Sequence, residues 1–343
     1  ASSMHKSSDF DVDELVPAAL EATEGNKGEV ASIMNALIGS CCLLEDRETA
    51  SERVQQLLEA YEELEETNDI SPDIVTFSLA YKAFSLDPES IALAEYVLEQ
   101  GLRQSKKAAG GKRRKKLASS RRKSSSTCTL AESDLKRLCG DDFAVLLETD
   151  DFVVINKPSG VPCFHKKATT AGKIRKGKGK KDLSASADIS LEDALLNCNV
   201  PLSTLNPEAL GLVHRLDRGS SGCMVVAKTN EMHATLVSEF FLRRTKKKYL
   251  TIVAPAPDPS MPEEGFIDLP VDERPARSKY RVVERCGTAA ALLEFDIYTG
   301  RKHQVRVHAA EGLSCPVLLD TLYKIDEDEG SGLENLVEID GSK

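Results

Sequence analysis

Residues 211–228 read GLVHRLDRGSSGCMVVAK, and this stretch decides the expected fold. Residues 212–213 and 223–227 are apolar and rich in β-branched side chains, which is typical of buried strands. The residues between them, 214–222, are polar and rich in glycine and serine, so they form the connecting turn. The stretch therefore predicts two strands joined by a turn that presents polar side chains.

Asp217 lies in the middle of this turn, where packing gives no reason for a carboxylate. Arg215 and Arg218 flank it, so the ionised side chain lies in a positive local field that also attracts an anionic ligand. Two interpretations follow from the residues alone. Asp217 is either a reactive carboxylate, acting as a nucleophile or a base, or a turn residue that hydrogen-bonds its own backbone.

Three further segments carry related information. Residues 151–160 read DFVVINKPSG, residues 247–249 read KKY, and residues 299–308 read TGRKHQVRVH. Together with HRLDRGSSG at 214–222, they resemble the RluA-type pseudouridine synthases, whose catalytic signature usually reads HRLDxxTSG. The four blocks occur in the family's order over roughly residues 145–323, which makes the resemblance far more specific than any one motif.

The resemblance implies an α+β fold, with a mixed, largely antiparallel sheet in a catalytic domain of the pseudouridine synthase type. Hydrophobic periodicity adds a small all-α helical-hairpin region before it. It also implies the reaction, which is the isomerisation of specific uridines in ribosomal or transfer RNA to pseudouridine. That reaction needs a carboxylate and involves no redox change. We therefore expect no cofactor and no metal ion.

The same resemblance assigns roles by motif position. Asp217 is the expected catalytic carboxylate, and Tyr249 is the ring expected to pack against the uracil and handle a proton. Arg306 is expected on a helix over residues 303–311, from which its guanidinium would hold Asp217 bidentately. For Lys157, a structural role in its Lys-Pro turn also stays open. Contacts to RNA are expected from His214, Arg215, Arg218, Lys157, Arg301 and His303.

The composition is that of an ordinary globular protein, with 41% hydrophobic and 29% charged residues. No run of about 18 apolar residues occurs, and the opening residues lack the pattern of a secretory signal. We expect an intracellular protein, in the cytoplasm or in an organelle such as a plastid or mitochondrion. The nine cysteines are scattered, which predicts free thiols with neither disulfides nor a zinc site.

The formal net charge of −10 conceals a segregation of charge. Residues 1–100 carry 5 Lys or Arg against 22 Asp or Glu, whereas residues 101–319 carry 38 against 25. A local basic excess neutralises phosphates whatever the sign of the whole chain. We therefore expect RNA as the partner, bound by a monomer that does not associate with a membrane.

Hydrophobic periodicity predicts a helical region over residues 29–104, after a disordered acidic N-terminus over 1–28. Residues 72–101 resemble one pentatricopeptide repeat, a helix pair that in its family stacks to bind single-stranded RNA. The spacing between the two predicted helix pairs is not constant. A plain α-hairpin domain, or a fragment of a longer repeat array, is therefore the alternative.

The remaining segments follow from charge. A basic linker is expected over residues 105–131, since eleven Lys or Arg and no acidic residue lie between positions 103 and 123. The catalytic domain then covers 132–325, with a basic insertion at 165–181. An acidic tail over 326–343 follows where the family usually has a further strand, so the sheet is expected to lack one edge.

Three other functions compete with an RNA-modifying enzyme. The first is an RNA-binding protein with a degenerate, inactive synthase domain, because residues 219–221 and 315–320 depart from the family pattern. The second is a hydrolase that uses a serine of the turn with His214, but Gly-Ser-Ser-Gly is not the G-x-S-x-G elbow. The third is a metal site of His214, His303 and His308, and the five-residue spacing of the last two does not place both on one helix face.

Overall fold

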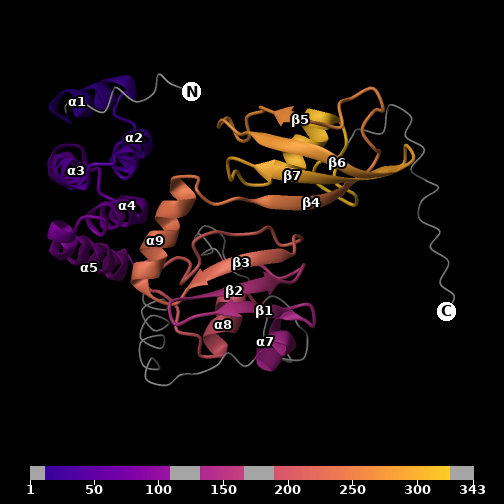
Figure 1. Ribbon diagram of the computed structural model, residues 1–343, viewed down its shortest axis with the longest axis horizontal. Helices are drawn as coiled ribbons and strands as arrows, with labels where there is room; N and C mark the ends of the chain where they lie inside the picture. The colour runs from indigo at the N-terminus through magenta and orange to yellow at the C-terminus, as the bar shows by residue number, and fades with distance from the viewer. Residues whose placement is uncertain (1–11, 109–131, 166–188, 325–343) are drawn as a thin grey trace, which may run out of the picture. The chain divides into compact units, whose positions relative to one another are not determined.

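The computed structural model describes residues 12–108, 132–165 and 189–324. Most of the expected basic linker and basic insertion lie outside these ranges, as do the first part of the expected disordered N-terminus and the acidic tail. The chain divides into two compact units, Ala1–Leu242 and Arg243–Lys343. Figure 1 labels their helices and strands. No helix in the described ranges is long and apolar enough to cross a membrane.

The first unit begins with a layer of helices. Their apolar stripes meet in one core, which includes Val30, Ile38, Leu57, Tyr61 and Phe84. Helix starts are fixed by side chains that accept backbone N–H groups, as the N-terminal caps of α2, α3 and α4 show. The elements are α1 (Val12–Ala22), α2 (Lys27–Cys41), α3 (Arg47–Asn68), α4 (Ile74–Phe84), the 3-10 turn η1 (Pro88–Ser90) and α5 (Ile91–Ala108).

The position of helix α1 differs from the disorder expected at the N-terminus. The sequence predicts disorder over residues 1–28, but α1 covers Val12–Ala22. Ala19 is buried, and Val16 and Leu20 pack against the helical core. Burial of this apolar stripe offsets the entropy lost on ordering the segment, which its acidic composition had concealed. At the other end of the layer, α5 continues past the expected limit at residue 104.

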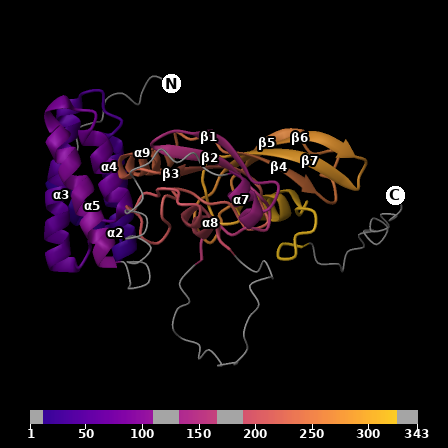
Figure 2. The same cartoon turned by 90° about the horizontal axis from the view of Figure 1, so that it is seen from below.

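The rest of the first unit contains a three-stranded antiparallel sheet in the order β1-β2-β3. The central strand buries Val153, Ile155 and Lys157 on one side. Helices α7 and α8 lie on one face of this sheet (Figures 1 and 2). The elements are α7 (Glu132–Cys139), β1 (Ala144–Glu148), β2 (Phe152–Lys157), α8 (Leu191–Asn197), β3 (Gly222–Ala227) and α9 (Asn230–Phe241).

One local prediction in this part is wrong. Leu212 and Val213 do not form a strand, because Leu212 makes only a single bridge to Val226. The error concerns the end of an element, where local sequence carries little information. Helix α9 is capped by Thr229, whose hydroxyl accepts a backbone N–H bond from the first turn.

Helix α9 packs against α4 and α5 on one side and β3 on the other (Figures 1 and 2). The Ser238 hydroxyl of α9 donates to the carbonyl of Ser78 on α4 at 2.7 Å. The Ser105 hydroxyl of α5 donates to the carbonyl of Thr204 at 2.8 Å. The helical layer and the three-stranded sheet, which the sequence predicts as separate regions, are therefore packed together in the first unit.

The second unit is a four-stranded antiparallel sheet in the order β4-β7-β6-β5. Helix α10 and the turn η2 cover one face, where Phe295 and Leu313 belong to the same core. On the other face, Glu294 lies 3.2 Å from both Lys248 and Arg281. The elements are β4 (Lys248–Val253), β5 (Glu264–Ile267), β6 (Ser278–Cys286), β7 (Ala290–Ile297), α10 (Gln304–Val307) and η2 (His308–Gly312).

The predicted α+β class is confirmed, and every pair of named strands in the described residues is antiparallel. Strand β5 was not predicted. The continuous helix expected over residues 303–311 is interrupted, because α10 ends at Val307 and η2 continues as a single π-helical turn. Within that turn, the buried His308 donates through Nε2 to the carbonyl of Leu269 at 2.9 Å.

Candidate active site

The turn over residues 214–222, named the HRLD loop here, is bonded to the neighbouring Asn-Lys-Pro turn. The Gly160 N–H donates to the Arg218 carbonyl at 2.7 Å, and Arg218 Nε donates back to the Gly160 carbonyl at 2.9 Å. The Ser159 hydroxyl donates to the Gly219 carbonyl at 2.8 Å. These bonds fix the outer side of the loop.

The inner side of the loop is held by packing. Leu216 is buried, and its carbonyl accepts from the thiol of Cys163 at 3.3 Å, while burial raises the pKa of that thiol. His214 Nε2 accepts the backbone N–H of Val225 on β3 at 3.0 Å. The His214 ring also stacks on Phe240 of α9, with centroids 4.7 Å apart. His214 thus connects the loop to both β3 and α9.

Asp217 lies between these anchors. It is partly exposed, whereas the preceding Leu216 is buried. Its backbone carbonyl accepts the N–H of Ser220 at 3.1 Å, which closes the turn. A carboxylate on an anchored turn can meet a ligand with little reorganisation, which is what a nucleophile or general base requires.

The structure does not support the predicted contact between Lys157 and RNA. Its side chain is fully buried, and its ammonium donates to the carbonyls of Pro158 and Val161 at 2.8 and 2.9 Å. Burial lowers the pKa of Lys157, and the negative charge of Asp217 is among the influences that oppose this shift. These contacts fit the structural role in the turn that the sequence left open for Lys157. They also place a buried cation near Asp217.

The two arginines beside Asp217 have different roles. Arg218 donates its Nε–H to the Gly160 carbonyl and so shapes the loop. Arg215 is exposed, and its Cζ lies 5.5 Å from the ring centroid of Phe164, a cation–π contact. A phosphate contact by Arg215 stays a prediction.

Arg306, in the second unit, has a bidentate partner that the sequence did not indicate. Its Nε and Nη2 donate to the two carboxylate oxygens of Asp320 at 2.6 and 2.7 Å. Asp320 is 3% exposed, and these bonds, with backbone donors from Leu322 and Tyr323, lower its pKa to about 2. Asp320 therefore occupies the bidentate position predicted for Asp217. Asp217 belongs to the first unit, so a contact with Arg306 stays a prediction.

Tyr323 completes the surroundings of Arg306. The guanidinium Cζ lies 4.9 Å from the Tyr323 ring centroid. The Tyr323 hydroxyl lies 3.1 Å from Nδ1 of His303, and the two rings meet edge-on. Sequence reasoning missed both Asp320 and Tyr323, because nothing in their local sequence marks them as partners of residues 14 to 20 positions earlier.

A group of cations surrounds Arg301. Arg301 Nε donates to the carbonyl of Pro275 at 3.1 Å. Burial and the charges of Arg274 and Arg243 lower the pKa of Arg301, and burial and Arg243 lower the pKa of Lys247. We call Arg243, Lys247, Arg274 and Arg301 the basic cluster. Mutually repelling cations of this kind favour a bound anion.

Tyr249 lies on β4, opposite Phe295 of β7. It is half-buried and packs against the core of the second unit. A half-buried side chain of this kind is ordinary in a sheet. Part of the Tyr249 ring is nevertheless accessible to a ligand. Its expected proximity to Asp217 involves both units and stays a prediction.

The cysteines in the described part of the chain are free thiols, and no group of three or more His, Cys, Asp or Glu there is arranged to hold a metal ion.

Part of this chain is similar to known proteins. Residues 151–311 match the family described as RNA pseudouridylate synthase. The ribosomal large subunit pseudouridine synthase D of Nitrosomonas europaea is 32% identical over 193 residues, covering 52% of this chain and 49% of that protein. The chloroplastic RNA pseudouridine synthase 2 of Oryza sativa subsp. japonica is 29% identical over 240 residues, with coverages of 57% and 53%. The solved human RNA pseudouridylate synthase domain containing 4 is 27% identical, with a TM-score of 0.40 and coverages of 56% and 70%.

Residues 151–311 are therefore a pseudouridine synthase domain of the RluA type. The chain spans about half the length of the curated relatives it matches. The likeness of residues 72–101 to a pentatricopeptide repeat stays a prediction.

Proposed function

We propose that the protein isomerises uridine in RNA to pseudouridine, with Asp217 as the catalytic carboxylate. The observation that carries the proposal is the family match of residues 151–311, which contains the whole HRLD loop. The anchoring of that loop by Gly160, Leu216 and His214 supports it, because a catalytic group must be held in place.

The proposed reaction conserves atoms and electrons. The N1–C1′ bond of uridine breaks, a C5–C1′ bond forms, and the hydrogen on C5 leaves as a proton while N1 gains one. Asp217 either attacks C1′ of the ribose or accepts the neighbouring ribose proton. These steps need neither an oxidant nor a reductant.

Tyr249 and Arg306 enter the proposal by their motif positions. Tyr249 packs against the uracil, and Arg306 stabilises the ionised Asp217. A guanidinium has five N–H donors, so the two bonds to Asp320 are compatible with a second carboxylate partner. Asp320 then orients Arg306 for this role.

RNA binding has support in both units. The target uridine must leave its stack, which costs a few kcal/mol that contacts to phosphates offset. The basic cluster and the exposed Arg215 are the described candidates for those contacts. The names of the bacterial and rice relatives favour ribosomal RNA as the substrate and an organelle as the compartment.

Tritium release from RNA labelled at C5 of uridine tests the proposal. The wild type should release tritium. Asp217→Asn and Asp217→Ala should release none while RNA affinity stays within about twofold, since one partly exposed carboxylate contributes little to phosphate binding. Asp141→Asn, which changes an exposed carboxylate outside the HRLD loop, should behave as the wild type.

Two outcomes would contradict the proposal in different ways. A wild type that binds RNA tightly but releases no tritium is the degenerate RNA-binding protein. Turnover that survives Asp217→Ala removes Asp217 from the reaction.

A further inference from the structure

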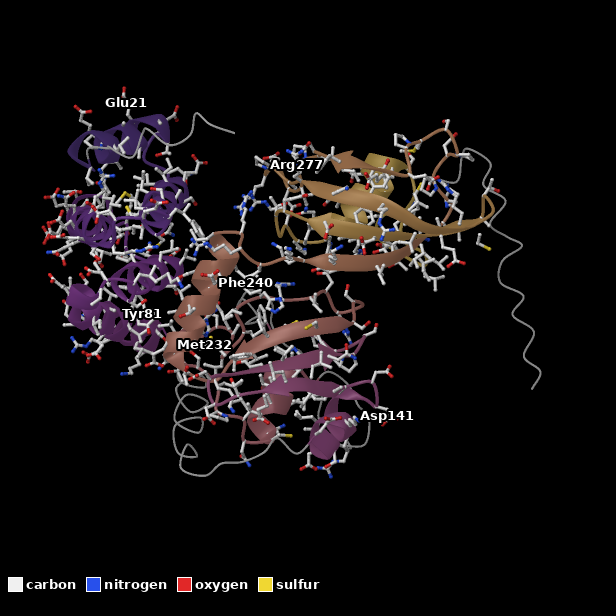
Figure 3. The ribbon with its side chains drawn as sticks, in the orientation of Figure 1. Glu21, Tyr81, Asp141, Met232, Phe240 and Arg277 are labelled. Atoms are coloured by element: carbon white, nitrogen blue, oxygen red, sulfur yellow. The ribbon has the colours of Figure 1, made fainter. Side chains whose placement is uncertain are left out.

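Helix α9 contacts two structures with consecutive residues near its end. Phe240, in the last turn (Figure 3), stacks on His214 of the HRLD loop at 4.7 Å and 23°. The next residue, Phe241, lies against Gly39 of α2, where a Cβ would be 3.1 Å from Phe241 Cε1 and 3.5 Å from Leu242 Cδ2. Leu242 itself packs against the helical core.

Other contacts fix the rest of α9 to the same helical layer. Ser238, which is buried, donates to the Ser78 carbonyl of α4 at 2.7 Å. Glu239 lies 3.5 Å from Lys82 of α4. Ala234 belongs to a small core with Leu98 of α5 and Leu205. The position of α9 is therefore determined by α2, α4 and α5 together.

The other end of this chain of contacts is His214. Its ring is held between Phe240 and the Val225 N–H, three positions before Asp217. Packed interiors are stiff, so a shift of α9 is transmitted to side chains that touch it. A displacement of about 1 Å at a catalytic group can cost about 100-fold in rate.

We propose that the helical layer of residues 12–108 positions the HRLD loop through α9, with Phe240 as the positioning residue. This gives the layer a role in the catalytic step that does not require it to touch RNA. The charge of the layer supports a role without RNA contact. Residues 1–100 carry 5 Lys or Arg against 22 Asp or Glu and so repel phosphates. The kinetic consequence rests on the proposed function, whereas the structural consequence does not.

Gly39→Ala in the whole 343-residue chain tests the coupling from the distant end, because the new Cβ would lie 3.1 Å from Phe241 Cε1 and the ring must give way by a few tenths of an ångström. The matched control is Gly28→Ala in the same helix, where the nearest atom to an added Cβ is Asn26 Oδ1 at 3.6 Å, an ordinary contact. Hydrogen exchange of residues 211–228 and single-turnover tritium release are measured, with exchange of β2 as the internal reference. We expect Gly39→Ala to speed exchange in the loop at least about threefold and to slow turnover about tenfold or more, with RNA affinity unchanged. Gly28→Ala should change neither.

Phe240→Leu and Phe240→Tyr test the same coupling at its near end. Leu removes the ring and should reproduce both effects, whereas Tyr keeps the ring and should restore wild-type exchange and turnover. The proposal is overturned if loop exchange and turnover stay at wild-type values in Gly39→Ala and Phe240→Leu. The exchange measurement decides the question even if the wild type proves inactive, and Gly39→Ala decides it if Phe240→Leu does not fold.

Discussion

Arg306 and Asp320 face each other through two parallel hydrogen bonds of 2.6 and 2.7 Å. The carboxylate is almost completely buried and also accepts the backbone N–H groups of Leu322 and Tyr323. Such a pair holds a guanidinium in one orientation. Asp320 is therefore a residue through which the geometry of Arg306 can be changed without touching Arg306.

Asp320→Asn should slow turnover about tenfold or more, equivalent to about 1.4 kcal/mol, because the amide cannot accept both guanidinium bonds. RNA affinity should change little. Asp258→Asn is the matched control, since Asp258 accepts bonds from Ser260 in an exposed loop. Equal turnover in the two variants would remove Asp320 from the positioning of Arg306.

The same variant has a predicted pH signature. The pKa of Asp320 is lowered to about 2, so its carboxylate stabilises the fold above the ordinary value of 3.8 and loses this contribution as the pH falls towards 2. The difference in melting temperature between wild type and Asp320→Asn should therefore narrow on acidification below about pH 4. A constant difference would contradict the assignment.

Lys157→Met should destabilise the protein by about 1–3 kcal/mol, because the carbonyls of Pro158 and Val161 lose a buried donor. Turnover should also fall, since the turn that bonds to the HRLD loop is loosened. Urea unfolding provides the measurement. Lys106→Met, at an exposed lysine of α5, is the control and should stay within about 0.5 kcal/mol of wild type.

Gly211→Ala should destabilise the protein more than Gly25→Ala does. Gly211 has φ +69°, and an added Cβ would lie 2.7 Å from the Ala227 carbonyl oxygen of β3. We expect a loss of about 2 kcal/mol or more, of which about 1–2 comes from the left-handed backbone. Gly25→Ala isolates that part, because Gly25 has a similar φ of +72° and no atom within 4 Å of an added Cβ. Equal losses in the two variants would show that the close approach to β3 costs nothing.

His233→Leu should reduce the sensitivity of the fold to acid. His233 is fully buried in α9, its ring nitrogens have no hydrogen-bond partner within the described residues, and burial lowers its pKa to about 3. The unfolded state binds a proton near pH 6.5 and the native state only near 3, so stability is lost as the pH falls through this window. At about pH 5 the loss is about 2 kcal/mol, which Leu should abolish. Chemical unfolding of wild type and His233→Leu at about pH 5 and 7.5 measures this difference in unfolding free energy. The same pH dependence of stability in both proteins would contradict the prediction.

Salt should weaken RNA binding steeply, because phosphate contacts release counterions. Residues 166–181 carry eight Lys or Arg and lie outside the described ranges. Shortening this segment should flatten the plot of log affinity against log salt between about 50 and 200 mM, by about one unit for each phosphate that is no longer neutralised. Replacing it with a neutral segment of equal length separates charge from length. An unchanged slope would exclude it from the interface.

The sequence was sufficient for features that depend on neighbouring residues. The turn containing Asp217 followed from the apolar runs on either side of it, and β3 lies where the apolar run over residues 223–227 predicted a strand. It was insufficient where one side chain chooses between distant partners. The burial of Lys157 depends on carbonyls that only the folded turn presents, and the pairing of Arg306 with Asp320 depends on a chain reversal after η2. The stacking of Phe240 on His214 joins residues whose patterns contain no common signal.

Helix α9 has an implication for anyone who divides this protein experimentally. Composition suggests cutting near the lysine-rich stretch after residue 104, which would strip the helical layer from α9 and leave Ala234 and Leu242 facing water. A shortened enzyme made that way would carry a new adhesive patch and tend to aggregate. A fragment that is meant to keep α9 with its helical partners should therefore run from α1 through Leu242, the end of the first compact unit.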